Sequence, residues 1–162
     1  MKFAQDAKAY GGPVILIPFS EMNGNWFPWS GTLNGNTPEK MRRAYQYLHL
    51  AFEEADNVQF GWAPNAHSVP NVAGNQVEDY YPGDAYVDIV GVDGFNFGTP
   101  WMSFDEVFGD VLTRISTYNK PMMIFSIGSA AGDQKANWIR DMFEQMKKYP
   151  LLKGFIWFNE DK

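Results

Sequence analysis

The sequence predicts an α/β protein of the (β/α)8 barrel type, of which about five βα units are present. Three observations favour this fold. The strand-like runs are continuously apolar, as in parallel strands buried on both faces. They alternate with helical patterns, which indicates a parallel sheet. Polar or aromatic residues follow one strand after another, as at the catalytic face of such barrels: Glu21, Asp93, Asn96, Ser126 and Trp157. A doubly wound open sheet is the alternative, but no glycine-rich phosphate loop follows a strand.

The first residues resemble the end of a helix that stops at Gly11-Gly12 before Pro13. They contain no apolar core of a signal peptide. A chain that opens in this way suggests that a preceding segment has been removed. The run at 14–17 is then a strand, and it leads to Glu21 in a turn that contains Trp26, Phe27 and Trp29.

A helix is expected from Thr37, which can cap it, with Pro38 at its first position. It extends to about Ala55, because its apolar residues have helical spacing: Met41, Ala44, Tyr45, Leu48 and Phe52. Residues 58–63 form a short strand. Residues 64–83 are irregular, with a short helix near 76–80.

The second half continues the alternation, with strands at 87–97, 122–127 and 155–158. Ser103 caps a helix through about Tyr118, and acidic residues occupy its first turn, where the helix dipole favours them. Another helix spans 134–149, with one apolar side formed by Ala136, Ile139, Phe143 and Met146. We therefore expect residues 1–162 to form a single domain.

Composition excludes several classes of function. The net charge of −6 argues against nucleic-acid binding, and no apolar run is long enough to span a membrane. Without cysteine the chain has neither disulfides nor thiolate metal ligands. Its two histidines do not suggest zinc, because His49 lies in a helical pattern as a surface or half-buried residue. We expect no metal or cofactor.

The 17% aromatic content and the surroundings of Glu21 point to carbohydrate. Aromatic rings stack on sugar faces, and a carboxylic acid in an apolar wall can keep its proton for general acid catalysis. Alternatively, Glu21 forms a cap or ion pair at a strand end and the tryptophans fill a core.

Five motifs, in this order, resemble glycoside hydrolase family 26, the clan A β-mannanases and related β-1,3-1,4-glucanases. The motifs are Glu21-Met22-Asn23-Gly24 with Trp26-Phe27; Tyr80–Asp84; Val87-Asp88 with Gly91–Gly94; Lys120-Pro121 through Gly128–Ala130 with Trp138-Ile139; and Gly154–Asn159. The resemblance covers nearly the whole chain and implies strands four to eight of the family's barrel.

The resemblance implies a retaining mechanism on β-1,4-linked polysaccharide, either β-mannan or mixed-linkage β-glucan, and an extracellular setting. Glu21 matches the family's acid/base. Trp157 matches the aromatic platform at the cleavage point. The resemblance implies that the residues near the substrate are Asn23, Trp26, Asp93, Phe95, Asn96 and Trp157.

Three positions depart from the family's pattern. Ser126 stands where the family has its nucleophilic glutamate, Phe95 where it has a tyrosine, and Ser20 where it commonly has histidine. A serine without an activating base cannot replace the carboxylate. Asp93 and Glu160 are the nearest candidates for a second carboxylate, although Asp93 fits a structural acid better and Glu160 a solvated charge.

Three functions remain open: an impaired β-glycanase, a carbohydrate-binding remnant without turnover, and a barrel remnant that serves only as a scaffold. Eight units at this spacing would need roughly 250 residues, so strands one to three are missing. Either the chain is a fragment, or a companion segment or self-association covers the free strand edges, or the arc closes differently.

Overall fold

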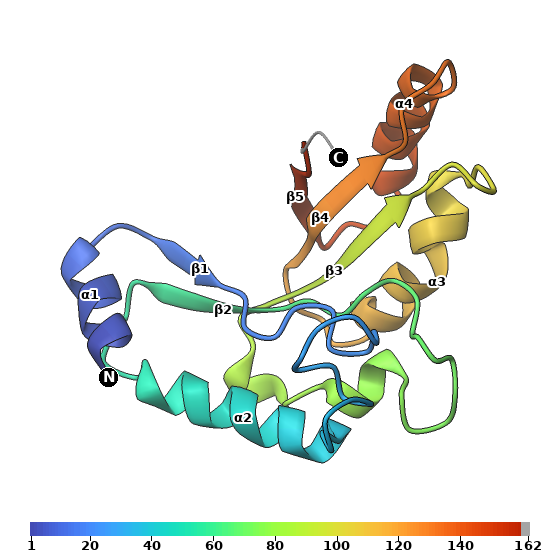
Figure 1. The fold of residues 1–162 in the computed structure, drawn as a ribbon. Helices are drawn as coiled ribbons and strands as arrows, with labels where there is room; N and C mark the ends of the chain where they lie inside the picture. Colours follow the sequence, from blue (N-terminus) through green and yellow to red (C-terminus); the bar gives the residue numbers. More distant parts are fainter. Residues whose placement is uncertain (160–162) are drawn as a thin grey trace.

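The computed structural model describes residues 1–159, which form a curved sheet of five parallel strands in the order β1-β2-β3-β4-β5 (Figure 1). Each strand pairs with its neighbour in the chain, so the arrangement is that of a partial (β/α)8 barrel, as predicted. The strands are β1 (Val14–Leu16), β2 (Val58–Trp62), β3 (Ile89–Asn96), β4 (Met122–Ser129) and β5 (Leu152–Trp157). The helices are α1 (Lys2–Tyr10), α2 (Pro38–Ala51), η1 (Val77–Tyr80), η2 (Asp84–Tyr86), α3 (Phe104–Ser116) and α4 (Lys135–Met146).

Some boundaries differ from the sequence prediction. Strand β5 begins at Leu152, three residues before the predicted start, because Leu152 pairs with Met122 across the ladder. The exposed Lys153 interrupts the apolar run that marked this strand in the sequence. No α-helix lies between β2 and β3 in the described chain, where the short helices η1 and η2 take its place.

The core has two layers, one on each side of the sheet. Val90, Val92 and Ile124 belong to the larger layer, which includes six buried residues of α3. On the concave side, Phe125 packs with Ala63 and Ile89 in a smaller cluster. Gly91 makes room for the Phe125 ring, since a Cβ at that glycine would lie 2.4 Å from it.

The helix starts agree with the sequence prediction. The Thr37 side chain accepts a hydrogen bond from the Lys40 backbone N–H, and Pro38 is the first helical residue of α2. Ser103 and Glu106 form a reciprocal capping box at the start of α3.

The prediction of which residues form the buried side of α4 was wrong in part. Trp138 and Met142 are its buried residues, whereas Ala136 and Phe143 are exposed. Ile139 and Met146 lie at the edge of the buried stripe. Two overlapping apolar stripes fit this helix, and burying the large Trp138 side chain removes more apolar surface from water.

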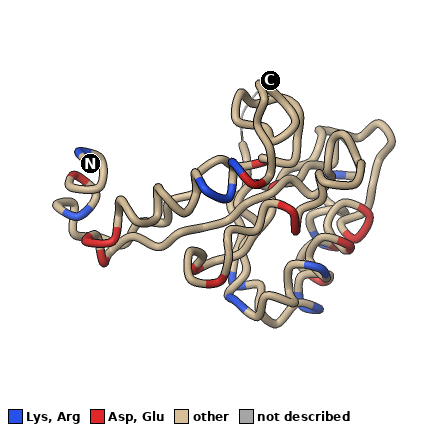
Figure 2. The backbone as a smooth tube through the Cα atoms, turned by 90° about the horizontal axis from the view of Figure 1, so that it is seen from below, with Lys and Arg blue, Asp and Glu red and all other residues tan. Residues whose placement is uncertain are grey.

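The charges are spread over the helices and loops, with Lys and Arg interspersed among Asp and Glu (Figure 2). None of the described helices is long and apolar enough to cross a membrane. The outer strands leave apolar residues in solvent, with Ile15 of β1 42% exposed and Ile156 of β5 50% exposed.

Candidate active site at the carboxyl ends of the strands

Glu21 lies in a tight turn after β1, and its backbone N–H donates to the Ala63 carbonyl at 2.8 Å. This bond fixes the turn against the end of β2. Glu21 and Phe19 both have positive φ angles, 56° and 55°. Non-glycine residues adopt this conformation at some energetic cost, and such residues concentrate at functional sites.

Both carboxylate oxygens of Glu21 accept a hydrogen bond. Oε1 accepts from the Asn65 side-chain amide at 2.9 Å, and Oε2 accepts from the Trp26 indole N–H at 2.6 Å. The Asn65 amide is itself oriented, because its oxygen accepts from the His67 backbone N–H at 3.0 Å. The carboxylate is thus held from two sides, while the Trp26 ring remains 44% exposed.

Asn23 is fully buried and holds the segment that carries Asn65. Its Oδ1 accepts from the Asn65 backbone N–H at 2.7 Å. Its amide nitrogen donates to the Asn65 carbonyl at 2.9 Å and to the Ser68 hydroxyl at 3.1 Å. The Asn23 amide, which the family resemblance places near the substrate, therefore uses both its oxygen and its nitrogen in hydrogen bonds within the protein.

Asn65 itself was missed in the sequence. It follows the strand at 58–63 directly, so the rule that chemistry gathers at strand ends would have found it.

A row of residues crosses the sheet at this level. Asn65 forms a bridge with Asp93, and Asp93 is in register with Ser126 on β4. The register shifts here by one residue, because Val92 pairs with Ile124 and leaves Phe125 as the extra residue of a bulge. Bulges of this kind re-aim side chains near active sites.

Asp93 is 6% exposed, and its Oδ1 has no hydrogen-bond partner among the described residues. Burial, together with the nearby charge of Glu21, raises the pKa of Asp93 to about 8. The side chain is therefore mostly a neutral acid at pH 7. A neutral, buried carboxylic acid is a poor nucleophile.

Ser126 is half-buried beside Asp93. Among the described residues, no side chain accepts a hydrogen bond from the Ser126 hydroxyl, so none is placed to activate it for attack. The other unusual serine, Ser20, accepts from the Trp29 indole N–H through its backbone carbonyl at 2.8 Å. Among residues 1–159, no three His, Cys, Asp or Glu side chains gather as a metal site requires.

Phe95 lies two residues beyond Asp93 and is half-buried. Its ring lies 5.8 Å from the Phe97 ring and 5.5 Å from the Phe158 ring, between centroids. Phe97 is 78% exposed. Three aromatic rings therefore line the ends of β3 and β5, where a tyrosine was expected from the family pattern.

Asn96 and Trp157 both make contacts within the protein. Asn96 is 1% exposed, and its amide bonds the loop after β3 through Gly98 and Met102. The Trp157 ring packs with the helix layer, 6.5 Å from the Trp138 ring on α4. Glu160, the other candidate carboxylate, lies outside the described residues.

Comparison with known proteins shows which family the chain belongs to. The sequence model of glycosyl hydrolase family 26 matches residues 2–161. Endoglucanase H of Acetivibrio thermocellus is 35% identical over 173 residues, which is 99% of this chain and 19% of that protein. A mannan endo-1,4-β-mannosidase of Bacillus subtilis is 24% identical over 97% of this chain and 42% of its own length.

Solved structures show the same partial match. The catalytic domain of an endo-β-1,4-mannanase from Bacillus sp. JAMB-750 has a TM-score of 0.73 and 26% identity, covering 91% of this chain and 41% of that one. A Bacillus subtilis mannanase has a TM-score of 0.70 and 24% identity, covering 98% and 46%. The chain thus spans less than half the length of these relatives. Given the family match over nearly all its residues, the chain belongs to glycosyl hydrolase family 26.

Proposed function

We propose that this chain binds β-1,4-linked polysaccharide at the edge that carries Glu21 and does not hydrolyse it. The observation that carries the proposal is the contrast across the site. Glu21 is held by two N–H donors, whereas the residue in line with Asp93 on β4 is a serine. One half of a two-carboxylate site is thus organised for catalysis, and the other half lacks its reactive group.

The chemistry of retaining glycosidases explains why this matters. Such enzymes use a carboxylic acid to protonate the glycosidic oxygen and a carboxylate about 5–5.5 Å away to attack the anomeric carbon. Glu21 has the chemistry of the first group. Ser126 cannot supply the second, and the raised pKa of Asp93 keeps its carboxyl largely neutral at pH 7.

The substrate class is inferred from aromatic surface and from relatives. Trp26, with its exposed ring beside Glu21, offers a stacking face for a pyranose. The relatives are named as an endoglucanase and as mannan endo-1,4-β-mannosidases. We therefore assign a β-1,4-linked glucan or mannan as the ligand.

The proposal also involves the free edges of the sheet. In residues 1–159, β1 and β5 each have one strand neighbour, and apolar Ile15 and Ile156 face solvent. Unpaired edges of this kind readily take up further strands. We infer that a companion segment or a second copy of the chain covers them.

Calorimetric titration of the chain with mannotetraose and cellotetraose tests the binding proposal. Binding to at least one of them is expected, and Trp26→Ala should weaken it by tenfold or more, because stacking and the hydrogen bond to Glu21 are both lost. Tyr47→Ala is the matched control, since it removes a 75% exposed aromatic ring on α2. Absence of heat with both sugars, or equal weakening by both variants, would contradict the proposal.

A further inference from the structure

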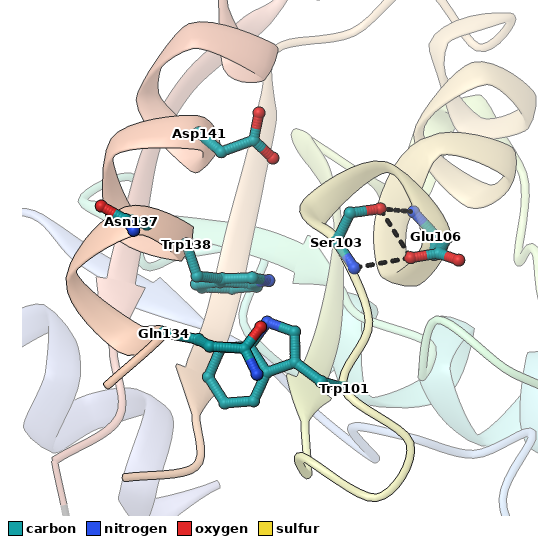
Figure 3. Close-up of a pocket in the computed structure, with 7 residues that line it drawn as sticks. All are labelled: Trp101, Ser103, Glu106, Gln134, Asn137, Trp138 and Asp141. Carbon is teal, nitrogen blue, oxygen red and sulfur yellow. Dashed lines mark hydrogen bonds between the residues drawn. The ribbon is translucent and has the colours of Figure 1, made fainter. Parts of the chain in front are cut away.

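A pocket lies outside the sheet, between the first halves of α3 and α4 (Figure 3). Its volume is about 400 Å³. Two tryptophans and five polar side chains line it: Trp101, Ser103, Glu106, Gln134, Asn137, Trp138 and Asp141. Figure 3 shows the Trp101 side chain reaching from the loop before α3 towards α4. None of these residues belongs to the group around Glu21.

The pocket is built on a fixed loop. The buried amide of Asn96 bonds both the N–H and the carbonyl of Met102, at 3.2 and 2.7 Å. The Trp138 indole N–H donates to the same carbonyl at 2.9 Å. Trp138 is 4% exposed and forms a rigid wall, whereas Trp101 keeps part of its surface in solvent. Trp101 is therefore the ring available to a ligand.

The polar side chains retain unused hydrogen-bonding atoms. Glu106 accepts from Ser103 through Oε2 alone, and Asp141 accepts from Gln145 through Oδ1 alone. The second oxygen of each has no partner within the part of the chain that the structure describes. On α4, the Asn137 amide nitrogen and the whole Gln134 amide are likewise without a protein partner in that part.

We propose that this pocket is an accessory saccharide subsite that binds one hexose unit of a β-linked polysaccharide against Trp101. A pyranose has an apolar face for the indole and hydroxyl groups that both donate and accept hydrogen bonds. The carboxylates of Glu106 and Asp141 can accept from these hydroxyls, and the amides of Gln134 and Asn137 can donate to them. A cation would use the two carboxylates and leave the amide donors unpaired, so the mixed set favours a neutral polyol.

The loop that carries Trp101 follows β3, the strand that carries Asp93. Asn96, which holds the loop, is three residues beyond Asp93 on β3, about 10 Å along a strand. The choice of a β-linked glycan rests on the proposed function, whereas the pocket itself does not.

Fluorine NMR of the chain labelled with 5-fluorotryptophan tests the two sites separately. The resonance of Trp26 reports on the Glu21 site, and that of Trp101 on the pocket; each is assigned by its Trp→Phe variant. During titration with mannotetraose or cellotetraose, the Trp101 resonance is expected to move and to saturate. If Trp26 moves and Trp101 does not, the subsite is refuted and the proposed function stands. If Trp101 alone moves, the subsite stands and the proposed function fails; if neither moves, both fail.

A variant on the exposed side of the pocket strengthens the test. Gln134→Ala removes a hydrogen-bond donor from the pocket. The Gln134 side chain makes no capping hydrogen bond to α4, so this variant should fold normally. The dissociation constant read from the Trp101 saturation curve is expected to rise by about three- to tenfold. Phe143→Ala, an exposed aromatic change on α4 outside the pocket, is the control and should leave the curve unchanged. Equal curves for wild type and Gln134→Ala would overturn the assignment.

Discussion

Replacing Asn23 with alanine is expected to destabilise the fold and not merely to weaken glycan binding. The buried side chain makes three hydrogen bonds, two to the backbone of Asn65 and one to Ser68. At roughly 1 kcal/mol net for each, the loss is about 3 kcal/mol of unfolding free energy. For a protein of this size, that lowers Tm by roughly 6–12 °C.

Thermal unfolding followed by circular dichroism measures this loss, with Ser68→Ala as the control. Ser68→Ala removes only one of the three bonds and should lower Tm by about a third as much. A Tm for Asn23→Ala equal to that of Ser68→Ala, together with loss of oligosaccharide binding, would refute the structural role. It would show instead that Asn23 contacts the glycan directly.

Three further predictions concern Asp93, the start of α3 and the edges of the sheet. The pKa of Asp93 is raised from 3.8 to about 8, so the folded chain binds a proton that the unfolded chain releases, and the free energy of unfolding should fall as pH rises between these values. Urea titrations at pH 5 and pH 8 measure this fall, and Asp93→Asn should remove it. Ser103→Ala removes the capping box of α3 and should cost about 1 kcal/mol in the same assay, whereas an unchanged midpoint would contradict the cap. Light scattering coupled to size-exclusion chromatography should show oligomers or aggregates, because β1 and β5 leave free edges; a single monomeric peak with cooperative unfolding would refute this.

The sequence predicted the fold well because the strands carry a strong local signal. Val90, Val92 and Ile124 sit in continuous apolar runs, and such runs occur only where both faces of a sheet are covered. The signal failed where burial is one-sided. Lys153 hid the start of β5, and two overlapping apolar stripes on α4 left its buried face ambiguous.

The site was predicted less completely, because residue type at a strand end does not reveal where polar atoms point. Asn23 and Asn96 have the chemistry to bind sugar, yet their amides are used by nearby backbone. Trp157 stands at the end of β5, but its ring packs with the helix layer. Asn65 could have been singled out from its place directly after β2, but its hydrogen bond to Glu21 is seen only in the three-dimensional structure.

The central claim is that the site keeps its acid and lacks its nucleophile. Release of reducing ends from β-1,4-mannan and mixed-linkage β-glucan tests this claim most directly. We expect no turnover above the residual rate that binding and a general acid can provide. Hydrolysis at a normal enzymatic rate that disappears in Glu21→Ala would contradict the claim, because it would require a nucleophile although Ser126 occupies the nucleophile position.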